Sequence, residues 1–209
     1  MELHIFGPGF STLVRSVRLH CEEKELFYTY GMEIEGVPVS WYSESHLAQH
    51  PFAKVPVLLH EEKRVFETIA ICRYLDALFP ERCSAEDLNT RTLIDQWASA
   101  LVTTVDAALV RNYLLPIAGP NRSAFIEPPM LAKMRIEAES ILAVLEAQLG
   151  NQPFLCGNRF SMADALLIPM LDYLEPIAEP TPLLDSRPRL SDYLVRMRER
   201  PSSAVLRGD

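Results

Sequence analysis

The first 80 residues alternate between short apolar runs of strand length and longer stretches in which apolar side chains recur at helical spacing. The predicted strands cover residues 3–6, 26–32, 57–59 and 64–66, and the predicted helices cover residues 12–22 and 68–79. A charged turn separates the last two strands, which indicates a hairpin. The predicted order is therefore strand–helix–strand followed by strand–strand–helix.

This order is the thioredoxin-like arrangement of an α/β domain. Residues 35–51 interrupt it with little apolar pattern. We expect a loop there, with one helical turn around residues 43–49.

The pattern changes near residue 80, where Pro80 ends the predicted helix. Residues 81–86 are interpreted as a linker, and residues 87–209 as an all-helical domain. Helical spacing predicts one long helix or two consecutive helices over residues 88–115, a helix over residues 130–149 and a final helix over residues 189–200. Between them, residues 119–129 are expected to form a loop and the proline-rich residues 176–188 an irregular segment.

Composition narrows the class of protein. The chain has 209 residues, of which 48% are apolar and 23% charged, as in soluble globular proteins, and its formal net charge is −8. Nucleic acid or an anionic membrane as main partner would require a basic face, so neither is expected. No apolar run approaches the roughly 18 residues that span a bilayer, and the early polar and glycine residues do not form a secretory signal.

The four cysteines and five histidines suggest neither disulfides nor a metal site. Cys21, Cys72, Cys83 and Cys156 are widely spaced, with no Cys-x-x-Cys pair. They are interpreted as reduced thiols of a cytoplasmic protein. No metal is expected.

Residues 154–165 (Phe-Leu-Cys-Gly-Asn-Arg-Phe-Ser-Met-Ala-Asp-Ala) contain a helix start. Ser161 and Asp164 have the Ser-x-x-Asp spacing of an N-cap in which each side chain satisfies a backbone donor of the other. We interpret both residues as structural.

Residues 52–58 (Phe-Ala-Lys-Val-Pro-Val-Leu) and the helix start at Glu67-Thr68 form a second motif. A Val-Pro bond leads into an apolar strand, and a helix begins after the hairpin. The amides at a helix N-terminus attract a carboxylate, and Glu67 can take an ammonium group. The pattern suits a small zwitterionic peptide.

These motifs resemble those of glutathione transferases, over nearly the whole chain. The resemblance is to serine-type members, closest in pattern to plant-type and bacterial cytosolic enzymes. It implies a thioredoxin-like glutathione-binding domain over residues 1–80, the linker at 81–86, and the all-α domain. It also implies glutathione as co-substrate, a small hydrophobic electrophile as second substrate, and a homodimer.

The resemblance implies that Ser11, where the first strand turns into the first helix, is the catalytic residue that contacts the glutathione sulfur. Thr12 is the neighbour that could compete. The turn after the first strand, with Pro8 and Phe10, and the region of residues 95–113 would line the electrophile pocket.

The resemblance also assigns the glutathione-binding residues Lys54, Val55, Pro56, Glu67 and Thr68. Lys54 would reach the glycine carboxylate, and Val55 would pair its main chain with the cysteinyl unit, which requires a cis Pro56. Glu67 and Thr68 replace the usual acid-serine pair, and the site for the γ-glutamyl carboxylate should be retained.

The chain departs from the family pattern at four positions. Trp41 and Tyr42 stand nearest to the His-Lys pair that helps bind the glycine carboxylate in plant-type enzymes. His50 replaces an Asn, and Ala53 replaces a Gly.

Three functions remain open. The first is an enzyme that stabilises the glutathione thiolate for attack on a hydrophobic electrophile or a peroxide. The second is a glutathione-dependent isomerase or thiol-disulfide enzyme, against which Ser11 in place of a Cys argues. The third is a non-catalytic interaction protein with the same fold.

Overall fold

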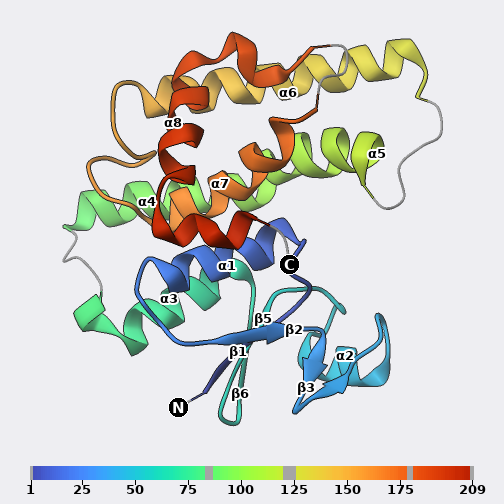
Figure 1. The fold of residues 1–209 in the computed structure, drawn as a ribbon, viewed down its shortest axis with the longest axis vertical. Coiled ribbons are helices and arrows are strands. Elements are labelled where there is room, and N and C mark those ends of the chain that lie inside the picture. The colour runs from blue at the N-terminus through green and yellow to red at the C-terminus, as the bar shows by residue number, and fades with distance from the viewer. Residues whose placement is uncertain (1, 83–86, 120–125, 178–180, 208–209) are drawn as a thin grey trace. The chain divides into compact units, whose positions relative to one another are not determined.

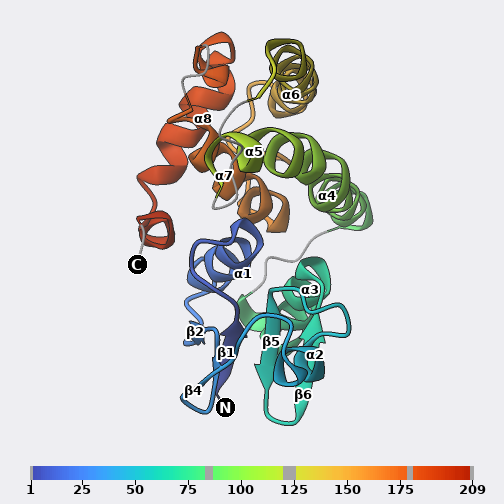
Figure 2. The ribbon, with the colours of Figure 1, turned by 90° about the vertical axis from the view of Figure 1, so that its right-hand side faces the viewer.

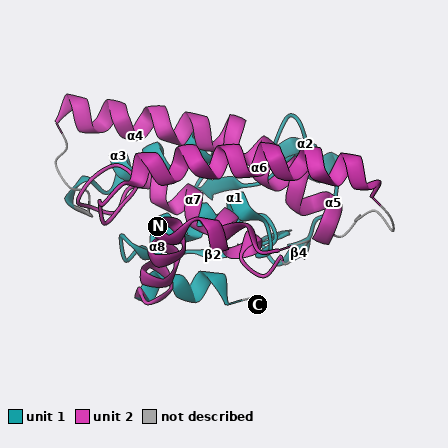
Figure 3. Cartoon of the chain, turned by 90° about the horizontal axis from the view of Figure 1, so that it is seen from above, with its two compact units in different colours: residues 1–86, 201–209 teal, residues 87–200 magenta. Residues whose placement is uncertain are grey.

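The computed structural model describes residues 2–82, 87–119, 126–177 and 181–207. The chain divides into two compact units (Figure 3). Residues 1–86 and 201–209 form the first, and residues 87–200 form the second. Cys83 and most of the predicted linker lie outside the described residues.

A four-stranded sheet in the order β2-β1-β5-β6 organises the first unit (Figure 1). Its strands are β1 (Leu3–Phe6), β2 (Thr29–Gly31), β5 (Val57–His60) and β6 (Lys63–Phe66). β1 pairs parallel with β2 and antiparallel with β5, and β5 pairs antiparallel with β6. The predicted thioredoxin-like order is confirmed.

The helices α1 (Thr12–Glu22) and α3 (Thr68–Leu78) pack on one face of this sheet (Figure 2). The strands contribute alternate apolar residues to the core, as the period of two in a strand requires. The helices contribute residues three to four positions apart. The core cluster consists of Leu3, Ile5, Val14, Val17, Cys21, Leu58, Ile71 and Leu75.

The stretch between β2 and β5 contains more structure than its sequence pattern indicated. α2 (Glu44–Gln49) is the expected helical turn, and Ser43 caps it. A small hairpin of β3 (Glu33–Ile34) and β4 (Val37–Pro38) was not expected. Its turn places Glu35 and Gly36 at φ 50° and 78°. Two consecutive positive φ values match the twist of a two-residue hairpin.

Helices make up the second unit. They are α4 (Leu88–Ala100), the π-helical η2 (Leu101–Leu114), α5 (Leu115–Ala118), α6 (Pro128–Leu149), α7 (Met162–Leu174), the short 3₁₀ segment η3 (Leu183–Ser186) and α8 (Pro188–Arg198). α7 is predominantly apolar and buried along nearly its whole length, and α4, η2 and α8 contact it. A helix with this composition belongs in the centre of a bundle.

α4, η2 and α5 form one continuous helix from Leu88 to Ala118, one of the two alternatives predicted. Within the described residues it is the one helix long and apolar enough, by length and composition, to cross a bilayer. Asp95, Asp106 and Arg111 interrupt its apolar residues, so it is not an uninterrupted apolar run of the kind considered in the sequence analysis. The helix packs against α6 and α7 and buries Leu101, Leu109 and Tyr113, as a core helix does.

The start of α7 is built as the sequence predicted. The Asp164 carboxylate is fully buried and accepts hydrogen bonds from the Ser161 amide (2.9 Å) and the Ser161 hydroxyl (2.8 Å). It also accepts hydrogen bonds from the Leu155 amide (2.8 Å) and the Tyr193 hydroxyl (2.9 Å). Burial raises the pKa of Asp164, and these hydrogen bonds oppose that shift.

The last described segment, η4 (Pro201–Leu206), belongs to the first unit, although the sequence-based division placed it with the helical domain. It packs against α1 and buries Val205 and Leu206. The Ser202 hydroxyl donates to Glu23 Oε1 at 2.5 Å. Apolar burial and this hydrogen bond account for the difference, which a linear reading of the chain does not detect.

Candidate active site

The strand register brings three chain segments to one end of the sheet. Phe6 of β1 pairs with Val57 of β5, and Val57 pairs with Phe66 of β6. Adjacent strands lie about 4.8 Å apart. The turn after β1, the Val55–Pro56 bond before β5 and the start of α3 after β6 therefore emerge side by side. All six predicted site residues lie on these three segments.

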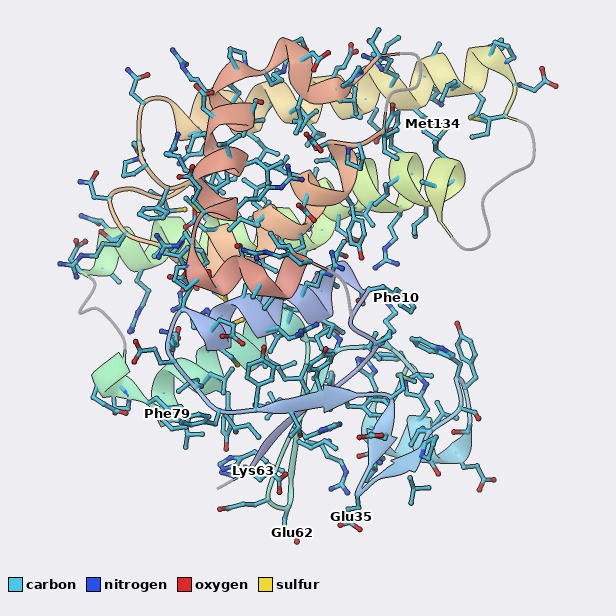
Figure 4. All side chains as sticks on the ribbon, viewed as in Figure 1. Phe10, Glu35, Glu62, Lys63, Phe79 and Met134 are labelled. Atoms are coloured by element: carbon cyan, nitrogen blue, oxygen red, sulfur yellow. The ribbon has the colours of Figure 1, made fainter. Side chains whose placement is uncertain are left out.

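The opposite end of the sheet carries the β5–β6 turn. Glu62 and Lys63 lie there, far from Phe10, as the labels of Figure 4 show. The predicted site therefore occupies a single edge of the first unit.

Gly7 allows the first two segments to approach closely. Its φ of 151° is rarely adopted by residues with a side chain. A Cβ at this position would lie 2.5 Å from Val14 Cγ2 and 3.1 Å from Val55 Cβ. Its amide donates to Gly31 O at 3.0 Å. The missing side chain thus lets the turn that leads to Ser11 lie against Val55, and the hydrogen bond ties the start of this turn to β2.

Ser11 is the N-cap of α1 and is half-buried. Its Oγ accepts a hydrogen bond from the Val14 amide at 3.5 Å, which is long for such a bond. Arg15 Nε donates to Gly9 O at 2.9 Å and fixes the turn before Ser11. Thr12, the competing hydroxyl, is the first residue of the helix and is only 7% exposed.

The Val55–Pro56 peptide bond is cis, as the resemblance implied. Pro56 is buried, Val55 is half-buried, and the Lys54 side chain is exposed. Lys54 and Val55 thus lie directly before the cis bond, at the same end of the sheet as the turn after β1.

Glu67 and Thr68 form the start of α3. Glu67 has φ 69° and ψ 119°, a conformation that is rare for a residue with a side chain, and its side chain makes no capping hydrogen bond. Glu67 is exposed, whereas Thr68 is 3% exposed. The first-turn amides of α3 therefore receive no hydrogen bond from the Glu67 side chain, and the partial positive charge of the helix end favours an anion.

Two of the departures from the family pattern, His50 and Ala53, lie in the turn before Lys54. His50 is 2% exposed, and its Nδ1 accepts a hydrogen bond from the Phe52 amide at 3.1 Å, two residues along the chain. An Asn side chain makes the same bond in a turn. Burial lowers the pKa of His50, which favours the neutral ring needed for this acceptor. Ala53 has φ 47°, a value that explains why a Gly suits this position.

His46 was not identified from the sequence, yet it joins the site segments. Its ring is fully buried on α2. Nδ1 lies 3.2 Å from the amide nitrogen of Tyr42, and Nε2 lies 3.3 Å from the carbonyl oxygen of Lys54. The only signal in the sequence was a polar residue at the third position of a capped helical turn, which is too common to be specific.

Aromatic side chains are exposed in the same unit. Phe10, directly before Ser11, is 63% exposed, and Trp41 and Tyr42 are 46% and 77% exposed. Among the described residues, no three His, Cys, Asp or Glu side chains are grouped as a metal site requires.

A thioredoxin-like sheet and a cis proline directly before an inner strand define a protein of the thioredoxin-fold class. In this protein a second, all-helical unit follows the thioredoxin-like one.

Comparisons with known proteins give the family. Models of the N-terminal and C-terminal domains of glutathione S-transferase match residues 1–77 and 124–196. Glutathione S-transferase F10 of Arabidopsis thaliana is 27% identical over 179 residues, which cover 83% of this chain and 81% of that protein. The chain belongs to the glutathione transferase superfamily.

Solved structures agree on the fold. The structure of poplar glutathione transferase F1 matches with a TM-score of 0.84 at 24% identity and covers 99% of this chain and 97% of that one. The structure of glutathione S-transferase-I bound with the ligand lactoylglutathione has a TM-score of 0.77 at 23% identity and covers 98% and 97% of the two chains.

Proposed function

We propose that this protein is a glutathione transferase in which Ser11 stabilises the glutathione thiolate for attack on a hydrophobic electrophile or a peroxide. One observation carries the proposal. The register Phe6–Val57–Phe66 aligns a helix-start hydroxyl, a cis Val-Pro bond and an open helix start at one end of the sheet. Family membership supports glutathione as the ligand of this site.

The hydroxyl of Ser11 is chemically able to perform this role. A serine hydroxyl has one hydrogen to donate and can accept two hydrogen bonds. Ser11 Oγ accepts the long bond from Val14, and among the described residues none accepts a hydrogen bond from it. Its hydrogen therefore remains for a ligand sulfur.

The required stabilisation is within reach of one such bond. A free thiol has a pKa of about 8.5, and lowering it by about two units requires roughly 2.7 kcal/mol of preferential binding of the thiolate. A hydrogen bond to a charged acceptor contributes about 1.5–3 kcal/mol. The N-terminus of α1 adds about 0.3–1 kcal/mol.

The remaining residues bind the peptide. The main chain of Val55, beside Pro56, pairs with the cysteinyl unit, and the Lys54 ammonium faces the glycine carboxylate. The α3 amides and the Thr68 hydroxyl take the γ-glutamyl carboxylate, and Glu67 takes the ammonium. The exposed ring of Phe10 next to Ser11 offers an apolar surface to the electrophile.

The test is a pH titration of thiolate absorbance in the complex with glutathione. Ser11→Ala should raise the pKa of the bound thiol by about one to two units, since it removes a bond of about 1.5–3 kcal/mol. Glutathione affinity should change little, because the bond favours thiolate over thiol more than it anchors the peptide. Thr12→Ala is the matched control and should shift the pKa less. An upward shift with Thr12→Ala alone would identify Thr12 as the donor.

We further propose that the protein acts in the cytoplasm as a two-fold homodimer, as the family resemblance implies. Sedimentation at micromolar concentration should give twice the chain mass. A monomer under these conditions would refute the assembly.

A further inference from the structure

We infer that His46 is a positioning residue that orients the Val55 amide toward glutathione by holding the carbonyl group of Lys54. The inference rests on the proposed function, because it assumes that Val55 binds the cysteinyl unit. It concerns a residue that touches no substrate and acts through the backbone.

The two neighbours of His46 fix the state of its ring. The Tyr42 backbone nitrogen can only donate a hydrogen bond, so Nδ1 accepts at 3.2 Å. The Lys54 carbonyl oxygen can only accept, so Nε2 carries the hydrogen and donates at 3.3 Å. His46 thus carries its ring hydrogen on Nε2 and bridges two backbone groups, that of Tyr42 four residues before it and that of Lys54 eight residues after it.

The bond to Lys54 acts on Val55 because a peptide group is planar. The carbonyl of Lys54 and the amide of Val55 belong to one peptide unit. Holding the oxygen therefore fixes the direction in which the Val55 N–H points. A hydrogen bond to the oxygen also polarises the peptide unit and strengthens its N–H as a donor.

Ring contacts prevent the imidazole from turning away. The ring of Phe6 meets it edge to face, with centroids 5.4 Å apart, and the ring of Trp41 does the same at 5.3 Å. Phe6 is the last residue of β1, directly before the turn that carries Ser11. His46 consequently links the sulfur-binding turn to the segment that binds the peptide main chain.

Simple space filling does not account for the imidazole. A position that is fully buried among aromatic rings is suited to a phenyl ring, and a buried polar ring needs hydrogen bonds to be tolerated. Both nitrogens have a partner here. The polar atoms, and Nε2 above all, are therefore the feature to be tested.

Three substitutions separate packing from the two hydrogen bonds. His46→Phe keeps a ring and removes both bonds. His46→Gln places its amide nitrogen near the position of Nε2 and can still donate to Lys54. His46→Asn carries its polar atoms nearer to Nδ1 and cannot reach Lys54.

Calorimetry with glutathione and steady-state kinetics provide the readouts. His46→Phe and His46→Asn should weaken glutathione binding and raise its KM by about tenfold, with kcat at saturating glutathione within about twofold of wild type. His46→Gln should stay within about threefold of wild-type affinity. The bound-thiol pKa should be unchanged in all three, because Ser11 is intact. The binding stoichiometry reports the folded fraction separately from the affinity.

Equal affinity in wild type and His46→Asn, or a loss in His46→Gln as large as in His46→Phe, would overturn the inference. A fall in stoichiometry and thermal stability with unchanged KM would show a structural role and also overturn it. The proposed function is tested separately. If the His46 variants give one of these contrary results while the wild type binds glutathione and Ser11→Ala raises the bound-thiol pKa, the proposed function holds and only the role of His46 is refuted. Absence of glutathione binding by the wild type would overturn both.

Discussion

The starts of α3 and α7 are two helix N-termini that each carry an acidic and a hydroxyl residue, yet they are built oppositely. At α7, Asp164 is fully buried and accepts four hydrogen bonds, from Leu155, Ser161 and Tyr193. At α3, Glu67 is exposed, has φ 69° and makes no capping bond.

The difference shows how to separate a structural helix start from a binding one. Side-chain oxygens that already accept hydrogen bonds from groups of the same chain are not available to bind a ligand, and they stabilise the fold. A helix start whose cap residue leaves the first amides without a side-chain partner, in a rare backbone conformation, retains its binding capacity. Strained residues of this kind cluster at functional sites. The predictions below measure how far this contrast holds.

The largest effect should come from Asp164→Ala. The change leaves the buried donors of Leu155, Ser161 and Tyr193 without their acceptor, and each unsatisfied group costs about 1–3 kcal/mol. We expect a loss of at least about 3 kcal/mol in the free energy of unfolding, measured in urea. The affinity of the remaining folded protein for glutathione should be unchanged.

Two variants calibrate that loss. Tyr193→Phe removes one of the donors and should cost clearly less than Asp164→Ala, whereas Asp192→Ala on the exposed side of α8 should change stability little. Equal stability of Asp164→Ala and wild type would remove the contrast between the two helix starts.

The next largest loss of stability should come from replacing Asp76, near the C-terminal end of α3. Asp76 lies 2.8 Å from His20 Nε2 and 3.1 Å from Lys24 Nζ, both on or next to α1. Burial alone would raise the pKa of Asp76, but the hydrogen bond and charge of His20 and the charge of Lys24 hold that pKa well below its usual range. Asp76→Asn should therefore lower the free energy of unfolding at pH 7 by about 1.5–3 kcal/mol.

The sign of the pH dependence follows from the lowered pKa. The folded protein binds protons at Asp76 less readily than the unfolded chain, whose pKa is about 3.9. The stabilisation is complete above that value and is lost as the pH falls through the lower folded-state pKa. The difference between wild type and Asp76→Asn in urea melts should shrink below about pH 4. Glu62→Gln, at an exposed turn, is the control and should show no such trend.

A smaller effect, on binding alone, should come from the start of α3. Glu67→Ala and Thr68→Val should each weaken glutathione binding by more than about tenfold, or roughly 1.4 kcal/mol, with the fold intact. Calorimetry measures the affinity, and thermal melts report the stability. Unchanged affinity in both variants would remove these residues from the site.

Glu61 provides a matched control for Glu67. It is also an exposed glutamate with a positive φ, 53°, but it lies in the β5–β6 turn at the other end of the sheet. Glu61→Ala should leave glutathione affinity unchanged. Glu67→Gly should lose affinity without losing stability, because glycine tolerates the backbone conformation better.

The smallest effect should be the stability cost of Ser11→Ala. An N-cap serine usually contributes about 1 kcal/mol, but the bond from Val14 to Ser11 is 3.5 Å long. The loss in the free energy of unfolding should therefore be less than about 1 kcal/mol. A larger loss, without a shift of the thiol pKa, would show that Ser11 is an ordinary helix cap.

The regular parts of the fold could be predicted because their patterns are local. The strand period in residues 57–60 and 63–66, the helix stripe of α6 and the Ser161–Asp164 cap each lie within a short window. The family-model matches confirm the family that these motifs indicated, and the solved structures confirm the fold. The individual roles of the six site residues stay predictions.

Features that depend on contacts across the chain were missed. His46 is recognisable only from its bond to Lys54, and η4 only from its packing against α1. The β3–β4 hairpin is too short for a period of two to show. The sequence marked residue 50 as a departure, but only the bond from Phe52 explains why His50 can replace an Asn.

The position of η4 has a consequence for biosynthesis. The hydrogen bond between Ser202 and Glu23 spans 179 residues, and η4 covers part of α1 with Val205 and Leu206. During translation α1 is synthesised before the helical unit, residues 87–200, whereas η4 is synthesised after it. Until the helical unit and η4 have been synthesised, the face of α1 that η4 covers in the folded protein therefore remains exposed.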